Sequence, residues 1–219
     1  MKGPLFFAKI LLFGEYGIIK DSMGLSIPYN FYHGSLKIPY KNNTSIKESH
    51  QKLLDFSNYL KTLDADLISF NWKKFNFDLE RKIYFDSSIP QGYGVGSSGA
   101  LVAAIYYQYA LRKITILENL TKEKLLYLKN IFSLMESFFH GKSSGLDPLN
   151  SYLCLPILIN SKKHIETIGI PPQNTNGKGA VFLIDSGVAS KTAPMISIFM
   201  ENMKKEAFNN MICLLYTSD

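Results

Sequence analysis

The sequence has few cysteines and no long apolar run, and each shortage excludes a class of protein. Its 219 residues include two cysteines, Cys154 and Cys213, too few for a disulfide framework and without metal-ligand spacing. No apolar stretch approaches the length of a membrane span. The apolar N-terminal stretch is interrupted by Lys9, Gly14 and Glu15, and no small-residue cleavage site follows, so we expect two strands with a turn there rather than a signal peptide. We therefore expect a cytoplasmic protein without membrane contact.

The chain is basic, but its positive charge is not concentrated. The net charge is +6, and the lysines are scattered apart from short pairs at 73–74, 162–163 and 204–205. A nucleic-acid-binding surface would need a basic stripe. We interpret the positive charge as a lysine-rich surface and do not expect nucleic acid as a partner. The expected partner is a small-molecule substrate, and a homodimer is possible.

Hydrophobic patterning predicts a mixed fold in a chain long enough to bury a core. The periodicities indicate helices over 49–63, 98–111, 121–139 and 192–208, with Thr121 and Thr192 as helix caps. Strands are predicted over 6–14, 16–21, 24–30, 31–40 and 81–90, as a hairpin of 156–161 with 164–170, and over 179–187. Because strands and helices mix without strict βαβ alternation, we predict an α+β fold.

The stretch from Ser87 to Ile105, SSIPQGYGVGSSGALVAAI, concentrates glycine before an apolar helix. It contains Gly92, Gly94, Gly96 and Gly99 together with Ser97 and Ser98. A helix start has free N–H groups and a partial positive charge, and glycines allow the backbone to approach an anion closely. This pattern favours a phosphate site over a simple glycine-rich turn.

The residues around the glycines can be compared with two known kinds of phosphate site. No Gly-Lys-Ser/Thr follows, so the stretch is not a P-loop. The string from Gly94 to Gly99 does fit Gly-x-Gly-x-x-Gly, with Glu118 near the distance expected of a ribose-binding acid. A nicotinamide-dependent oxidoreductase is therefore an alternative. Against it, Pro90, Gln91 and Gly92 separate the preceding strand from the motif, and the flanks lack a βαβ pattern.

Three segments together resemble the GHMP kinases, and mevalonate kinases most of all. PQGYGVGSSGA (90–100) is similar to the central motif of that superfamily, with Gly99 where alanine is usual. AKILLFGEYGIIKD (8–21) resembles the first mevalonate kinase motif, with Tyr16 where histidine is common. MESFFHGKSSGLDPLNS (135–151) resembles the family's glutamate-bearing helix and its Ser-Gly-(Ile/Val/Leu)-Asp turn. The segments occur in the family's order.

The resemblance implies an ATP-dependent kinase that uses Mg²⁺ and converts mevalonate to 5-phosphomevalonate. Phosphoryl transfer needs held phosphates, a bridging metal ion and a positioned acceptor hydroxyl. The implied nucleotide-binding residues are Gly92, Gly94, Gly96, Ser97 and Ser98; the metal ligands are Ser98 and Glu136; the catalytic residues are Asp147 and Lys9; the substrate-side residues are Glu15 and Tyr16. In these roles Asp147 would face the acceptor hydroxyl, and Lys9 would keep Asp147 ionised.

Structural interpretations of the same residues remain open at this point. Glu136 lies among Phe132, Met135 and Phe139, where helical phase decides whether it is a buried ligand or a solvated neighbour. Asp147 precedes Pro148 and, taken alone, is typical of a helix N-cap. For His140 we expect a role in the backbone turn rather than as a ligand.

The resemblance also implies a domain organisation. We expect a GHMP kinase N-terminal domain over 1–160, with the ribosomal protein S5 domain 2-like fold, and the start of a ferredoxin-like C-terminal domain over 161–219. The family's third glycine-rich motif is not found, so this second domain is expected to be mostly missing, and the activity of the chain as written is left open. Tyr16 leaves phosphomevalonate, homoserine and sugar kinase activities open.

Overall fold

The structure is a computed structural model that describes residues 3–40, 44–115, 120–161, 164–169, 183–185, 187–189 and 192–217. Its strands are β1 (Phe6–Phe13), β2 (Gly24–Lys37), β3 (Tyr84–Ser87), β4 (Ile157–Ser161) and β5 (His164–Thr167). Its helices are η1 (Gly17–Lys20), α1 (Thr44–Leu60), α2 (Trp72–Glu80), α3 (Ser97–Tyr109), α4 (Lys122–His140), α5 (Leu146–Leu153), α6 (Thr192–Asn202) and α7 (Glu206–Thr217). The α+β prediction is confirmed.

One antiparallel sheet contains the five strands, and the long β2 organises it. β1 pairs along one edge of β2, while the other edge pairs with β4 near its start and with β3 near its end. The prediction of two short strands over 24–30 and 31–40 is wrong, because β2 runs through both. The pairing register between β1 and β2 shifts between Phe7 and Ala8, and both strands continue past this irregularity.

The connection from β1 to β2 is also not the returning strand predicted over 16–21. Residues 17–20 form the 3₁₀ helix η1. Tyr16 and Asp21 flank it with φ values of 59° and 70°. These positive φ values turn the chain and are incompatible with an extended strand.

Two of the predicted helices were found with nearly the expected bounds. α3 is buried over most of its surface, and α4 begins after Thr121, whose side chain accepts a hydrogen bond from the Lys124 N–H at 3.4 Å.

The sequence patterns did not predict α2, although Asn71 caps this helix by accepting a hydrogen bond from the Lys74 N–H at 3.0 Å. The helix predicted over 192–208 is wrong, because the structure has two helices that separate after Asn202, a poor helix former.

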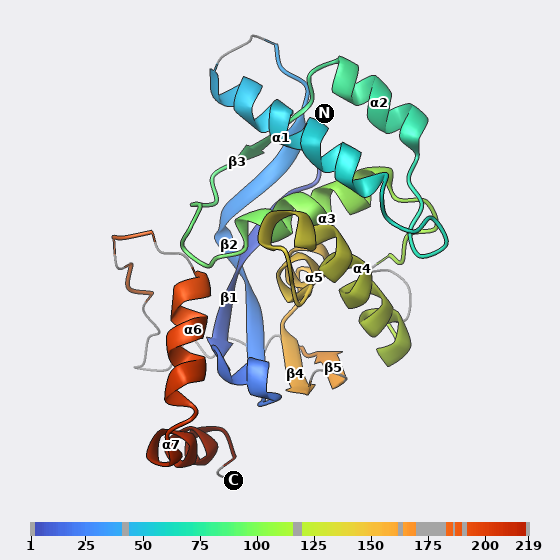
Figure 1. Ribbon diagram of the computed structural model, residues 1–219. Helices are drawn as coiled ribbons and strands as arrows, with labels where there is room; N and C mark the ends of the chain where they lie inside the picture. The colour runs from blue at the N-terminus through green and yellow to red at the C-terminus, as the bar shows by residue number, and fades with distance from the viewer. Residues whose placement is uncertain are drawn as a thin grey trace, which may run out of the picture.

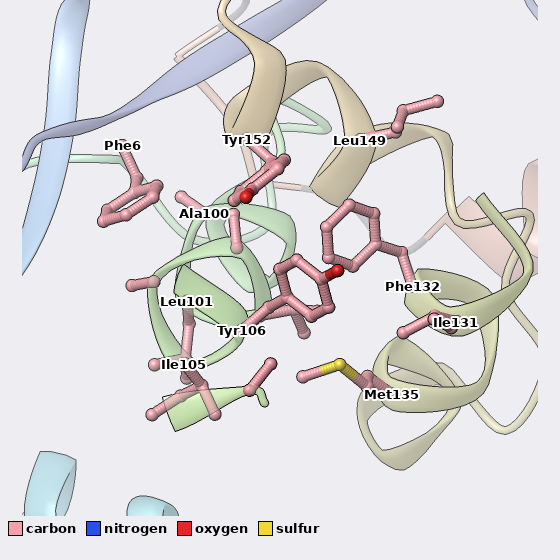
Figure 2. Close-up of a cluster of buried hydrophobic side chains, with 14 of the residues drawn as sticks. Phe6, Ala100, Leu101, Ile105, Tyr106, Ile131, Phe132, Met135, Leu149 and Tyr152 are labelled. Atoms are coloured by element: carbon pink, nitrogen blue, oxygen red, sulfur yellow. The ribbon is translucent and has the colours of Figure 1, made fainter. Parts of the chain in front are cut away.

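The helices α3, α4 and α5 lie together beside the sheet, with α2 at one end of the molecule and α6 and α7 at the other (Figure 1). Three rings join these helices. Tyr106 of α3 meets Phe132 of α4 and Tyr152 of α5 edge to face, at centroid distances of 5.0 and 5.1 Å (Figure 2). Such aromatic contacts add to the hydrophobic burial and fix the mutual position of the three helices.

α5 is also tied directly to the sheet. The Ser151 hydroxyl donates to the Phe7 carbonyl of β1 at 2.7 Å, and the Asn150 amide donates to the Ser26 carbonyl of β2 at 3.2 Å. Both side chains are buried, where an unpaired polar group is costly. These bonds set the position of α5 relative to β1 and β2.

Two predictions rest on residues outside the described ones. Most of the strand predicted over 179–187 falls there, as does Glu118. The domain boundary at residue 160 stays a prediction. In the described part of the chain, no helix combines the length and apolar character needed to cross a membrane.

Candidate active site

Three of the four glycines in the central stretch have backbone conformations that other residues rarely adopt. Gly92, Gly94 and Gly96 have φ values of 82°, 69° and 82°. Side chains at these positions would be strained, whereas glycine accepts positive φ without a steric penalty. The loop therefore approaches the start of α3 with bare backbone, as the sequence predicted for a phosphate-binding loop.

The fourth glycine, Gly99, serves packing instead. It lies within the first turn of α3, and a Cβ there would come within 2.7 Å of the Asp147 carbonyl carbon and 2.8 Å of the Pro148 nitrogen. Contacts this short do not occur between real side chains and backbone, so alanine could fit only if one helix shifted. Gly99 brings the starts of α3 and α5 together.

This close approach places Asp147 against Lys9. The Lys9 ammonium lies 3.0 Å from Asp147 Oδ1, and the Lys9 side chain is largely buried while a third of the Asp147 side chain remains exposed. The Lys9 N–H donates to the Val95 carbonyl of the glycine loop at 3.0 Å. A Cβ on Gly96 would lie 3.0 Å from Lys9 Cγ. The ion pair thus forms at the side of the glycine loop.

Electrostatics favour the charged form of Lys9 despite its burial. Burial by itself would lower the pKa of Lys9, but the surrounding carboxylates together more than offset this effect, with Asp147 contributing most by charge and hydrogen bonding. Glu15 and Glu136 add smaller upward contributions. The pKa of Lys9 is therefore raised, and the site holds a fixed positive charge beside the loop.

Asp147 is not the N-cap that it resembles in isolation. Gly145, in the left-handed conformation with φ 75°, caps α5, and Asp147 follows in the first turn. A carboxylate there is favoured by the partial positive charge of the helix N-terminus. Its side chain is thereby available to Lys9.

A second group of polar side chains gathers around Glu136 of α4. The Ser98 hydroxyl donates to Glu136 Oε1 at 3.0 Å, and His140 Nε2 lies 2.9 Å from the same hydroxyl oxygen. The Ser143 hydroxyl donates to Glu136 Oε2. Glu136 is 3% exposed, so the interpretation of a solvated residue is wrong and that of a buried carboxylate with partners is right.

Burial, and to a smaller extent the charge of Asp147, raise the pKa of Glu136 to about 7. The hydrogen bonds from Ser143 and Ser98 oppose this rise, as does the charge of Lys9. For a carboxyl group with a pKa in this range, a nearby cation strongly favours the ionised form.

The two substrate-side residues predicted from the first motif have different surroundings. Glu15 is exposed, and its charge acts on Lys9. Tyr16 stacks on Phe199 of α6, with ring centroids 5.5 Å apart. Phe199 belongs to a helix far along the chain, so the sequence pattern carried no signal for this contact.

Sequence reasoning missed two of the residues around Glu136. His140 was expected to serve the backbone turn, but its side chain contacts Ser98. Ser143 was not singled out, although it occupies the second oxygen of Glu136. His140 is the last residue of α4, one helical turn after Glu136, whereas Ser143 follows the helix and only the folded turn directs it back to the carboxylate.

Ser98 and Glu136 offer a hydroxyl and a carboxylate oxygen at hydrogen-bond distance, the type of hard donors that Mg²⁺ prefers. Among the described residues no group of three His, Cys, Asp or Glu side chains gathers to hold a metal. Few protein ligands suit Mg²⁺, which keeps most of its waters. The donors therefore fit this ion.

The dinucleotide-binding alternative is not supported by the topology. All paired strands in the described ranges are antiparallel, whereas that fold requires a parallel βαβ unit around the glycine motif. Ile114 and Thr115, the described start of its expected second strand, are not in a strand.

Comparisons with known proteins agree with the geometry. Residues 58–154 match the model of the GHMP kinases N terminal domain, a range that contains the glycine loop, Glu136 and Asp147. A search of curated proteins finds no match. Among solved structures, the Methanococcus jannaschii mevalonate kinase aligns with TM-score 0.53 and 15% identity over 98% of this chain and 71% of its own. The L. major mevalonate kinase in complex with R-mevalonate aligns with TM-score 0.52 and 15% identity over 99% and 69%. At such identity the likeness shows the fold.

Proposed function

We propose that the protein transfers the terminal phosphoryl group of ATP to a hydroxyl group of a small molecule, because residues 58–154 match the model of the GHMP kinases N terminal domain. The observation that carries the proposal is the Lys9–Asp147 ion pair, at 3.0 Å, beside a loop of positive-φ glycines. Phosphoryl transfer depends mainly on positioning and charge stabilisation, and this arrangement offers both.

The glycine loop and the start of α3 are the proposed nucleotide site. Gly92, Gly94 and Gly96 would let backbone N–H groups close on the phosphates, and Ser97 begins the helix whose N-terminus attracts negative charge. Gly96, the N-cap of α3, has no side chain to compete for the free N–H groups.

Ser98 and Glu136 are the proposed ligands of Mg²⁺. The ion, when bound, supplies positive charge that offsets the negative charge of the phosphates during transfer. Glu136 is buried with a pKa of about 7, so a bound cation would favour its ionised form at neutral pH, and Ser98 already faces it. Ser98 and Glu136 would each provide one donor oxygen, and water can provide the other ligands of Mg²⁺.

Asp147 and Lys9 act on the acceptor in this proposal. Asp147 keeps a third of its side chain exposed, so an acceptor hydroxyl can donate to it. Asp147 orients that hydroxyl and takes its proton, while the buried Lys9 ammonium holds the carboxylate and balances its charge.

For the acceptor we propose mevalonate, giving 5-phosphomevalonate. The first motif resembles mevalonate kinases, and its Glu15 lies near enough to act on Lys9. The two solved structures described above are both mevalonate kinases. Tyr16 stands where histidine is common, so phosphomevalonate, homoserine and sugars are the acceptors to compare.

The test is ADP release measured with MgATP and each acceptor in turn. We expect turnover with mevalonate, loss of at least about 100-fold in kcat in Asp147→Asn, and no change in Asp66→Asn, an exposed aspartate away from the site. Turnover with a different acceptor would keep the kinase and reject mevalonate. Turnover that survives in both Asp147→Asn and Lys9→Met would refute the proposed mechanism.

A further inference from the structure

We propose that Ser143 is a positioning residue that sets the orientation of the Glu136 carboxylate and leaves one of its oxygens, Oε1, for the metal ion. The inference rests on the proposed function, because it concerns the metal site assigned there. Ser143 donates to Oε2, while Oε1 faces the Ser98 hydroxyl. With Oε2 engaged, the carboxylate is expected to bind a cation through a single oxygen.

The direction of the Ser143 proton follows from its other bond. The Gly145 N–H donates to the Ser143 hydroxyl oxygen at 3.1 Å. A serine hydroxyl has one proton, so with Gly145 on its acceptor side the proton is directed to Glu136. The hydroxyl is therefore a fixed donor rather than a free rotor.

The backbone of Ser143 is held as firmly as its side chain. Its carbonyl accepts from the Ser133 hydroxyl of α4 at 2.5 Å. Gly145 packs on the same helix so closely that a Cβ would lie 2.1 Å from the Lys129 carbonyl oxygen. The turn after α4 is thus anchored on the helix that carries Glu136.

The same turn leads directly into α5. Gly145 is the N-cap of α5 and Asp147 lies in its first turn. Ser143 therefore connects the proposed metal ligand with the proposed acceptor-side carboxylate. Removing its hydroxyl would free Glu136 to rotate and would leave Oε2 and the Gly145 N–H without this partner.

Ser144 provides a matched control. It is exposed, and its hydroxyl accepts from the Leu146 N–H at 3.3 Å at the same helix start. Ser144→Ala thus removes an equivalent hydroxyl from the same turn without altering a bond to Glu136. Ser143→Thr retains the hydroxyl and should restore the wild-type behaviour.

The experiment measures Mn²⁺ binding by electron paramagnetic resonance, for the protein alone and with ADP, which requires no turnover. We expect Ser143→Ala to weaken Mn²⁺ binding about 10-fold or more, with Ser144→Ala unchanged and Ser143→Thr within about 3-fold of the wild type. Urea unfolding identifies any variant that fails to fold, and the threonine variant then carries the test.

The outcomes separate the inference from the function on which it rests. If Glu136→Gln loses Mn²⁺ and Ser143→Ala binds it as the wild type does, the positioning role is wrong and the metal site stands. If Glu136→Gln also binds normally, or the wild type binds no Mn²⁺ with or without ADP, the metal site and the role of Ser143 are both overturned.

Discussion

The two members of the Lys9–Asp147 pair differ in exposure, and this difference predicts that their removal has unequal effects on stability. The Lys9 side chain is 10% exposed and that of Asp147 is 33% exposed. Asp147→Ala leaves a buried ammonium without its partner, whereas Lys9→Met leaves a carboxylate that water can reach. An uncompensated buried charge is the costly outcome.

The magnitude follows from the degree of burial. Breaking a fully buried pair by removing one partner costs about 3–5 kcal/mol. Because Asp147 lies at the edge of the site, its removal admits water to Lys9, and we expect Asp147→Ala to cost about 2–3 kcal/mol. Lys9→Met should cost about 1 kcal/mol or less, since the methionine keeps most of the buried apolar contacts.

The double variant provides the decisive comparison. Lys9→Met combined with Asp147→Ala should be about 1 kcal/mol or more stable than Asp147→Ala alone, because the unpaired charge is gone. Asp147 also interacts favourably with the N-terminus of α5, but this contribution is lost with or without Lys9 and cancels in the double-mutant cycle.

The assay is equilibrium unfolding in urea at neutral pH, with the m-value monitored for two-state behaviour. Because the pKa of Lys9 is raised, the stability from the pair is complete below the unfolded-state pKa and is lost only as the pH rises through the folded-state pKa. Equal costs for the two single variants, or a double variant no more stable than Asp147→Ala, would refute the reasoning.

Two further predictions concern the neighbouring residues. Gly99→Ala introduces the residue that is usual in the resembling motif, but its Cβ would contact Asp147 and Pro148 too closely. We expect this overpacking to destabilise the protein by about 1–3 kcal/mol, more than the helix-propensity gain of about 1 kcal/mol. A variant as stable as the wild type in urea unfolding would contradict the close packing. In metal-free buffer with chelator, wild-type stability should fall from about pH 5 to pH 7 relative to Glu136→Gln, because the unfolded carboxyl ionises near pH 4 while burial raises the folded pKa to about 7. Parallel pH profiles would show that Glu136 ionises as readily in the folded protein as in the unfolded chain.

Local sequence patterns predicted the parts of the fold whose stability is local. The apolar run after Ser97 predicted the buried helix α3, and Thr121 predicted the start of α4, because helical periodicity and capping act within a few residues. The glycine stretch likewise predicted a bare-backbone loop, since positive φ at Gly92, Gly94 and Gly96 is a property of the residues themselves.

Long-range contacts decided what those patterns left open. The periodicity of β2 does not reveal that one strand continues past the irregularity opposite Phe7 and Ala8, because its pairing partners lie elsewhere in the chain. The burial of Glu136 depends on how α4 is rotated against its neighbours. The contact of Tyr16 with Phe199 joins residues from the two ends of the chain.

The sequence by itself therefore determined the chemical types of the site: glycines before a helix, a lysine on the first strand, and acidic residues on and after a later helix. The tertiary structure decided their arrangement, because Gly99 allows α3 and α5 to approach and so places Asp147 on Lys9. It also turned Ser143 back to Glu136 through the turn after α4. A residue pattern specifies which groups are available, but distances between segments far apart in sequence depend on the packing of side chains between them.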